Sequence, residues 1–373
     1  MNTIDKLKIL SEDSQYDLSC ACATGKNDRR RRGEDMRWLY PVSLPQGGSS
    51  LMLKTLLSNS CTNDCKYCPL RNETNIKRCT LQVEETAKIF MEYVKKKNII
   101  GMFLSSGVIN NPDYTMERIN AVASILRRKY KYKGYLHLKI IPGASDAAIE
   151  ETLSLSSAVS LNIETPGEKY FKDLSDSKNY INDIIRPMKL MSRLTATGER
   201  YSRVNLTTQF IVGASSEPDS DIVKYSFGLY KRLNFDRIYF SAYQAGLGNS
   251  NIPGEKRFHL RNEDLFTREH RLYQADFLIR KYGFKENEFY FEREGNFDLN
   301  RDPKQVWVDA HPEFFPIRIN KADKNELLRV PGLGPSTAGK IIKNRKLHDI
   351  RNISDLKVKG KQKEKIIPYI IYE

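Results

Sequence analysis

The sequence predicts an α/β protein in which repeated βα units form a parallel sheet, followed by a small all-α domain at the C-terminus. Short runs rich in β-branched residues alternate with segments of helical period between residues 51 and 282, which is typical of a parallel sheet. Near residue 332 a Pro-Gly-x-Gly turn separates two further helical patterns, which indicates a compact helical domain.

The predicted elements follow one another in strict alternation. Six strands are expected at residues 51–57, 99–104, 135–141, 158–163, 204–212 and 237–243. A helix is expected after each strand, at residues 83–97, 116–130, 145–155, 181–195, 219–232 and 262–282. Six βα units are too few for a closed barrel of eight strands, so the sheet should stay open.

The remaining segments set the predicted domain boundaries. Residues 1–50 have weak periodicity and are expected to form a helix and an ordered extension. The βα region should span residues 51–290, an irregular connector residues 291–315, and the helical domain residues 316–373. The N-terminal residues are polar and no long apolar segment occurs, so we expect a soluble, cytoplasmic protein with no membrane partner.

Positive charge is concentrated in two places. The formal net charge is +15 over 373 residues, and residues 316–373 carry 14 Lys and Arg against 6 Asp and Glu, a net +8. A second basic run is formed by Arg29, Arg30, Arg31 and Arg32. Concentrated positive charge indicates a polyanionic partner, although a solvated lysine-rich surface would have the same composition.

Three cysteines lie within eight residues directly after the first predicted strand. Cys61, Cys65 and Cys68 have C-x3-C-x2-C spacing, and soft thiolate ligands favour an iron–sulfur cluster or zinc. Zinc would need a fourth ligand such as Cys79 or a histidine, whereas a cubane cluster held by three cysteines leaves one iron open for a small molecule. A disulfide framework fits poorly in a long chain without a secretory signal.

The triplet, with Tyr67 just before its third cysteine, resembles the radical S-adenosylmethionine (radical SAM) superfamily. The resemblance implies a partial (β/α)6 barrel and a 4Fe–4S cluster whose open iron chelates the amino and carboxylate groups of S-adenosylmethionine. One electron from the cluster would cleave this cofactor to methionine and a 5′-deoxyadenosyl radical. A one-electron donor such as a flavodoxin or ferredoxin is implied as a partner.

The same resemblance implies further cofactor contacts at the ends of the strands. Ser105, Ser106 and Gly107 stand where the superfamily has Gly-Gly-Glu for the methionyl amine, so the acid of that pattern is missing. The other expected contacts are Asn162 and Glu164 to the ribose, Ile211 to the adenine and Tyr67 to the adenine. Asn162 and Glu164 are two residues apart and are expected on one face of the fourth strand.

Residues 319–342 resemble a helix-hairpin-helix motif. Glycines in the hairpin allow backbone amides to approach a phosphate, and the next helix adds its positive N-terminal dipole. The residues implied to bind DNA phosphates are Gly332, Leu333, Gly334, Ser336, Thr337, Lys340 and Lys343. A hairpin used only for packing is the alternative, and residues 347–369 are a possible second, degenerate hairpin.

The two parts together resemble DNA modification or repair radical SAM proteins associated with uracil-DNA-glycosylase-like partners. The primary hypothesis is an enzyme that abstracts hydrogen from a nucleotide in DNA. The alternatives are a radical enzyme acting on structured RNA and a non-catalytic metal protein that binds nucleic acid. The sequence leaves the substrate, the product and the roles of Cys20, Cys22 and Cys79 open.

Overall fold

The computed structural model describes residues 1–14, 38–43, 47–97, 99–256 and 262–373. The chain divides into two compact units, which we describe separately. The first contains Met1–Glu217 and Gly228–Glu269, and the second contains Pro218–Phe227 and His270–Glu373. The predicted boundaries at residues 290 and 315 stay a prediction. Across the described residues, no helix has the length and apolar character to cross a membrane.

A seven-stranded sheet forms the centre of the first unit, with its strands in the sequential order β1 to β7. The six parallel strands are β2 (Ser49–Leu56), β3 (Gly101–Ser105), β4 (Tyr135–Lys139), β5 (Ala158–Ser160), β6 (Asn205–Val212) and β7 (Arg237–Ala242). The predicted series of six βα units is therefore confirmed. Seven of the eight residues of β6 are buried, as expected for a parallel strand covered on both faces.

The sheet also contains one strand that the sequence analysis missed. β1 (Leu39–Ser43) pairs antiparallel with β2 and lies inside the segment predicted as an extension. Its Pro41 cannot donate to a strand ladder, and proline argues against a strand except at the edge of a sheet. β1 is such an edge strand, which explains why the residue pattern did not reveal it.

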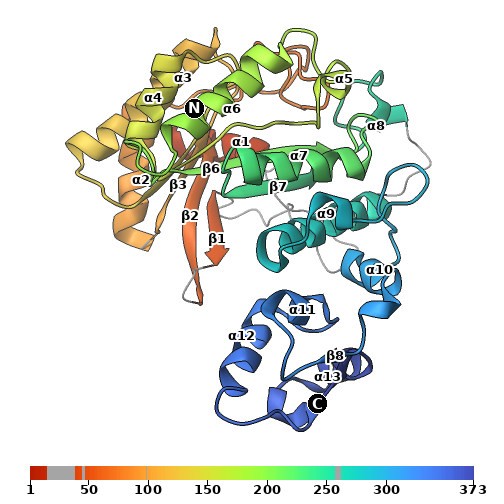
Figure 1. Cartoon of the computed structure of the whole chain (residues 1–373). Helices are drawn as coiled ribbons and strands as arrows, with labels where there is room; N and C mark the ends of the chain where they lie inside the picture. The colour runs from red at the N-terminus through yellow and green to blue at the C-terminus, as the bar shows by residue number, and fades with distance from the viewer. Residues whose placement is uncertain (15–37, 44–46, 98, 257–261) are drawn as a thin grey trace. The chain divides into compact units, whose positions relative to one another are not determined.

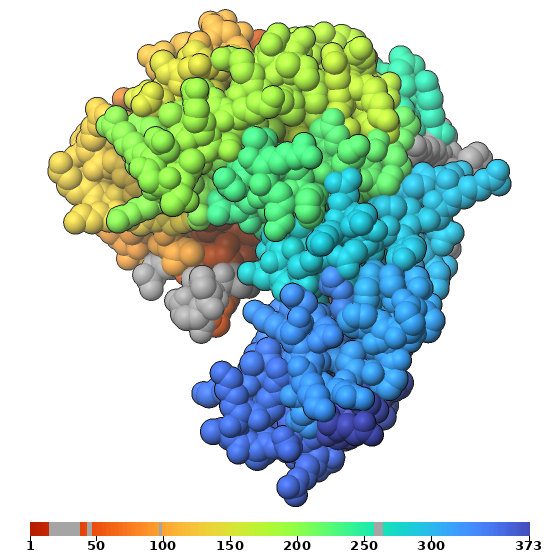
Figure 2. Space-filling model, viewed as in Figure 1, coloured from red at the N-terminus to blue at the C-terminus, as the bar shows by residue number. Residues whose placement is uncertain are grey.

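Helices lie in one layer beside the strands (Figure 1). The longer helices between strands are α2 (Val83–Lys97), α3 (Pro112–Ser124), α4 (Asp146–Leu155), α6 (Arg186–Leu194) and α7 (Asp219–Arg232). The short α5 (Glu168–Phe171) precedes α6, and α8 (Pro253–Lys256) and α9 (Asn262–Tyr282) follow β7. α3 continues into a π-helical turn at Ile125–Lys129, and another at Tyr180–Ile185 leads into α6. In the space-filling view, α3, α4 and α6 form a continuous yellow-to-green surface (Figure 2).

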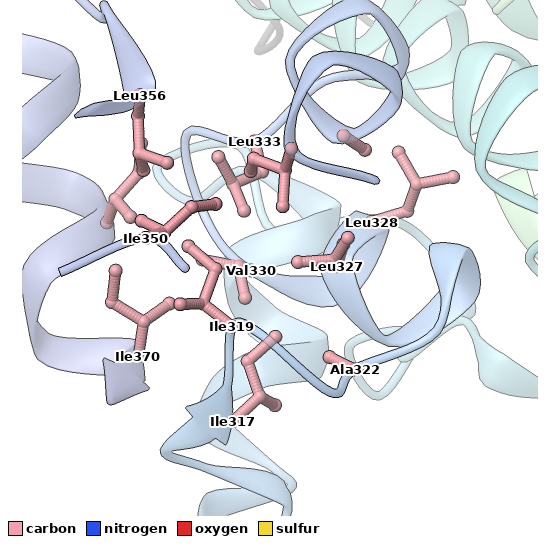
Figure 3. Close-up of a cluster of buried hydrophobic side chains, with 13 residues drawn as sticks. Ile317, Ile319, Ala322, Leu327, Leu328, Val330, Leu333, Ile350, Leu356 and Ile370 are labelled. Carbon is pink, nitrogen blue, oxygen red and sulfur yellow. The ribbon is translucent and has the colours of Figure 1, made fainter. Parts of the chain in front are cut away.

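The second unit is mainly helical and contains its own core. Its helices after α9 are α10 (Pro303–Asp309), α11 (Lys324–Arg329), α12 (Pro335–Asn344) and α13 (Gly360–Ile366). Figure 3 shows apolar side chains from these segments converging, among them Leu327, Leu333 and Ile350. Two short strands, β8 (Ile317–Arg318) and β9 (Ile370–Ile371), pair in parallel and add a small β element to the predicted helical domain.

The N-terminal helix α1 (Thr3–Asp13) packs against β2 through Leu7 and Leu10, whose side chains are fully buried. We expect Leu10→Ala to lower the free energy of unfolding by about 2–5 kcal/mol, because it removes buried methyl groups and leaves a cavity. Ile4→Ala in the same helix is the matched control, since Ile4 is 41% exposed and its loss should cost less than about 0.5 kcal/mol. Equal denaturant midpoints for both variants would contradict the packing of α1.

Candidate functional site

The carboxyl ends of the parallel strands meet at one pocket in the first unit. Its volume is about 180 Å³, far above the roughly 10–15 Å³ that one water molecule needs, so it is not a packing defect. Every residue that the sequence analysis assigned to a cluster or its cofactor lines this pocket. They are Cys61, Cys65, Cys68, Tyr67, Ser105, Ser106, Gly107, Asn162, Glu164 and Ile211.

The cysteine loop has almost no regular secondary structure, and one guanidinium group binds four of the backbone carbonyls in and beside it. Arg78 donates hydrogen bonds to the backbone carbonyls of Asn59, Leu70, Arg71 and Thr74. Buried backbone groups must be paired, and a loop cannot pair them through a helix or a strand ladder. Arg78 was not predicted as a site residue, because its contacts depend on how the loop is folded.

Each cysteine sulfur accepts one N–H group. The pairs are Val108 N with Cys61 Sγ at 3.4 Å, Lys178 Nζ with Cys65 Sγ at 2.8 Å, and Leu70 N with Cys68 Sγ at 3.4 Å. Hydrogen bonds to the sulfurs are one of the means by which proteins tune iron–sulfur clusters. The three thiols are therefore arranged as sulfur acceptors around one pocket.

Burial makes the thiols of Cys65 and Cys68 poor acids without a bound cation. Removal from water raises the pKa of the Cys65 thiol, and the nearby Lys178 ammonium offsets only part of that effect. Burial and the neighbouring Cys65 raise the pKa of the Cys68 thiol as well. Metal binding replaces thiol protons with positive charge, so the donor set fits a bound metal cluster.

The other cysteines do not join this group in the described residues. No three Cys, His, Asp or Glu side chains there come close enough to hold one metal ion. In a cubane cluster each cysteine binds a different iron, so the three sulfurs need not share one ion. Cys79 does not line the pocket, and its sulfur lies 4.0 Å from the carbonyl oxygen of Lys6. Cys20 and Cys22, like Arg29, Arg30, Arg31 and Arg32, lie outside the described residues.

Glu164 occupies an unusual backbone conformation beside the cysteines. Its φ of 65° is left-handed, although its N–H still donates to Gln209 O at 3.0 Å and its carbonyl accepts from Ile211 N at 2.8 Å. Such strained residues concentrate at functional sites. Burial, followed by the nearby Glu164 carboxylate, raises the pKa of the Tyr67 phenol, and the phenol is also hydrogen-bonded to that carboxylate.

The predicted strand at residues 158–163 is shorter than expected. β5 ends at Ser160, so Asn162 and Glu164 follow the strand and do not share one of its faces. Both still line the pocket, and Asn162 Oδ1 accepts a hydrogen bond from Lys139 Nζ at 2.7 Å. The ladder between β5 and β6 is interrupted because the Ile163 amide donates to Thr208 Oγ1 at 2.9 Å, and pairing returns only as an isolated bridge between Glu164 and Phe210.

Several pocket residues were missed by the sequence analysis. Lys139, Lys178 and Gln209 all line the pocket, and Gln209 Nε2 is buried without a hydrogen-bond partner among the described residues. Gln209 lies on β6 and could have been found from its place two residues before Ile211. Tyr243, which directly follows β7, also lines the pocket and donates its hydroxyl to the Glu255 carboxylate.

The hairpin of the second unit presents an uncapped helix N-terminus. Gly334 is the N-cap of α12 and has no side chain to cap the amides of Ser336 and Thr337 that follow. Ser336, Lys340 and Lys343 are exposed, Thr337 is half-buried, and the Leu333 side chain is buried in the core. Exposed amides at a helix N-terminus suit a phosphate group, whereas Lys340 lies in the middle of α12 and Lys343 in its last turn.

Gly332 has a structural task in addition. Its φ is +81°, and a Cβ there would lie 3.1 Å from Ile366 Cγ1 and 3.3 Å from Gln362 O. Gln362 Nε2 also donates to Gly332 O at 2.7 Å, which fixes the hairpin against α13. Replacing Gly332 would therefore disturb folding before it tested phosphate binding.

Two cations of this unit bind carbonyl groups inside it. Lys304 Nζ donates to Val330 O at 2.7 Å and to Leu333 O at 3.1 Å, on either side of the hairpin turn. Arg345, one of the 14 Lys and Arg residues between residues 316 and 373, donates to the carbonyls of Ile319 and Ala322. These contacts support the hairpin from within.

A second hairpin follows at a spacing of 25 residues. Lys357 has a left-handed φ of 50° where Gly332 has +81°, and Lys359 is the N-cap of α13 where Gly334 caps α12. The degenerate hairpin expected at residues 347–369 is thus present in the backbone, with lysines at both glycine positions.

Comparison with known families agrees with this geometry. Residues 55–225 match the radical SAM superfamily, and residues 315–366 match the helix-hairpin-helix motif. The chain therefore contains a radical SAM domain over residues 55–225, and a helix-hairpin-helix motif follows that domain. A search of curated proteins found no match.

Solved structures with a related fold include two of HydG and one of methylornithine synthase. HydG from Carboxydothermus hydrogenoformans, a maturase of FeFe-hydrogenase, is 16% identical with a TM-score of 0.47, over 61% of this chain and 51% of that one. The second HydG structure is 12% identical with a TM-score of 0.47, over 85% and 80%. Methylornithine synthase (PylB) is 13% identical with a TM-score of 0.46, over 60% and 62%. The chain thus spans about half of the first HydG.

Gly107 joins the end of β3 to the cysteine loop and allows a sharp test. A Cβ at Gly107 would lie 2.4 Å from Ser60 O and 3.2 Å from Cys61 Cβ, so Gly107→Ala must displace the loop. We expect a lower thermal midpoint and weaker metal binding. Gly228→Ala in α7 is the control, because nothing lies within 4 Å and alanine should stabilise that helix by about 0.5–1 kcal/mol. Effects of the same sign in both variants would contradict this packing.

Proposed function

We propose that this chain is a radical SAM enzyme that holds a 4Fe–4S cluster on Cys61, Cys65 and Cys68 and acts on a nucleotide in DNA, for repair or modification. One observation carries the proposal: three thiols and the polar ends of five strands line one pocket, in a chain that also contains a helix-hairpin-helix motif. When bound, the cluster supplies the electron that cleaves S-adenosylmethionine to methionine and a 5′-deoxyadenosyl radical.

The residues around the pocket have separable tasks in this proposal. Ser105, Ser106 and Gly107 hold the methionyl amine through hydroxyl and carbonyl oxygens, because the acid of the usual pattern is absent. Asn162 and Glu164 bind the ribose hydroxyls. All five line the pocket.

Apolar side chains on one side of the pocket would protect a radical from water. Tyr67 packs against a buried cluster formed by Leu174, Ile211, Ala214, Tyr243 and Ile252. In this arrangement Tyr67 and Ile211 provide the apolar surface against which the adenine packs. A dry wall also strengthens the polar contacts made on the opposite side.

The hairpin would hold the phosphate backbone of DNA. The uncapped amides of Ser336 and Thr337 and the charges of Lys340 and Lys343 lie on one helix, and contacts of this kind position a protein without reading bases. A cytoplasmic location, a flavodoxin or ferredoxin as electron donor and a uracil-DNA-glycosylase-like protein complete the proposal. Tighter binding of structured RNA than of duplex DNA would move the substrate to RNA.

The cluster assignment is tested by replacing each cysteine with alanine in protein purified without oxygen. Cys61→Ala, Cys65→Ala and Cys68→Ala should each lose the iron, the sulfide and the release of 5′-deoxyadenosine together, because a cubane needs all three thiolates. Cys79→Ala is the control and should keep all three. An intact cluster in Cys65→Ala, or zinc in stoichiometric amount in the parent protein, would refute the assignment.

DNA binding is tested with the double variant Lys340→Gln with Lys343→Gln. A truncation at residue 316 is less suitable, because it would leave Phe314 and Phe315 without the core they pack against. For each phosphate that the protein no longer neutralises, the slope of log affinity against log salt should fall by about 0.9. Cleavage of S-adenosylmethionine without DNA should be unchanged.

The matched control for the hairpin lysines is Lys88→Gln with Lys95→Gln, two exposed lysines of α2. This pair removes the same charge from the radical SAM domain and should leave the salt slope unchanged. Equal loss of affinity in both double variants would mean that the net charge, and not the hairpin, binds DNA.

A further inference from the structure

We propose that Lys178 is a positioning residue that raises the reduction potential of the cluster through Cys65. The inference rests on the proposed function, because it takes the three cysteines as cluster ligands. It adds a task for a residue that lies 113 positions beyond Cys65 in the sequence and outside the cysteine motif.

Of the three hydrogen bonds to the cysteine sulfurs, the one from Lys178 has a charged donor. Its Nζ lies 2.8 Å from Cys65 Sγ, whereas the sulfurs of Cys61 and Cys68 accept from backbone amides. Cys65 is also the most buried of the three cysteines, with 8% of its surface exposed. A charge-assisted hydrogen bond is about twice as strong as a neutral one, and its effect on charge is larger where water is excluded.

The cysteine motif itself holds the segment that carries Lys178. Asp64 accepts four hydrogen bonds from residues 175–177, two from the hydroxyls of Ser175 and Ser177, both at 2.6 Å, and two from backbone amides. Lys66 adds a backbone bond to Leu174 O at 2.8 Å. Asp64 and Lys66 are the residues on either side of Cys65. The cysteine loop therefore holds the segment that places the Lys178 ammonium beside the Cys65 sulfur.

The sign of the effect follows from charge. One-electron reduction adds one negative charge to the cluster, and the electron comes from an external donor. The Lys178 ammonium beside a ligating sulfur stabilises this added charge and therefore favours the reduced form. Removing the ammonium should make the cluster harder to reduce.

The test uses the full-length protein with its cluster reconstituted, titrated with dithionite and redox mediators and monitored by electron paramagnetic resonance. The Lys178→Met variant should still bind the cluster. At a given potential its ratio of oxidised to reduced cluster should rise at least tenfold, which corresponds to a midpoint potential lower by about 59 mV for one electron. Lys178→Arg keeps the charge and should shift the midpoint less. Asp64→Asn, which weakens the hold on residues 175–177, should shift it in the same direction as Lys178→Met.

Lys139→Met is the matched control. Lys139 also lines the pocket, but its ammonium donates to Asn162, so its loss should move the midpoint less than the loss of Lys178. The binding constant for S-adenosylmethionine, measured in parallel, distinguishes a cofactor contact from an effect on the cluster.

The outcomes separate the two proposals. A midpoint unchanged in Lys178→Met with full iron and sulfide, or weaker cofactor binding without a change in midpoint, overturns the role of Lys178 and leaves the proposed function standing. Absence of any cluster in the parent protein overturns the proposed function instead. If Lys178→Met fails to retain iron, the midpoint of Asp64→Asn decides, and an unchanged value there refutes the inference.

Discussion

The pocket depends on one constraint, which is that three thiols are presented by a partly buried loop with almost no regular secondary structure. Such a loop must find a partner for each buried backbone group and each sulfur outside a helix or strand ladder. Arg78 binds four of its carbonyls, Asp64 ties it to residues 175–177, and Arg71 donates to Cys68 O at 3.1 Å and to Leu247 O at 2.9 Å. The loop is therefore tied to the segments that follow β5 and β7.

Much of the fold could be predicted from the sequence, because each βα unit leaves a local signal. The bounds of α2, α7 and α9 are those predicted, since apolar residues recur there with helical period. The end of β5 was misjudged because the Ile163 amide bonds to the Thr208 side chain, and an apolar pattern does not indicate where a strand ladder is interrupted.

The candidate site was predictable only where its residues follow a strand. Carboxyl ends of parallel strands meet at one edge, so residues such as Ser105 and Glu164 could be placed together without a structure. Lys178 and Arg78 could not, because they lie in loops whose folding depends on distant partners. Their positions are set by hydrogen bonds to the cysteine loop, and neither follows a strand.

Positively charged side chains in this chain have two different roles: some bind groups inside the protein, and others are exposed and can meet a polyanion. The net charge does not distinguish the two roles. Lys304 and Arg345 bind carbonyls inside the second unit, and Arg329 lies 2.6 Å from Glu288 and stacks on Phe284 at 3.7 Å. Of these cations only Arg329 and Arg345 belong to residues 316–373, so two of the 14 Lys and Arg residues behind the net +8 of that segment already have partners within the protein. The glycines are divided in the same way, because Gly332 serves packing against α13 while Gly334 leaves the first amides of α12 uncapped. Phosphate binding and folding can be separated in this module only at residues such as Lys340, whose side chain is exposed.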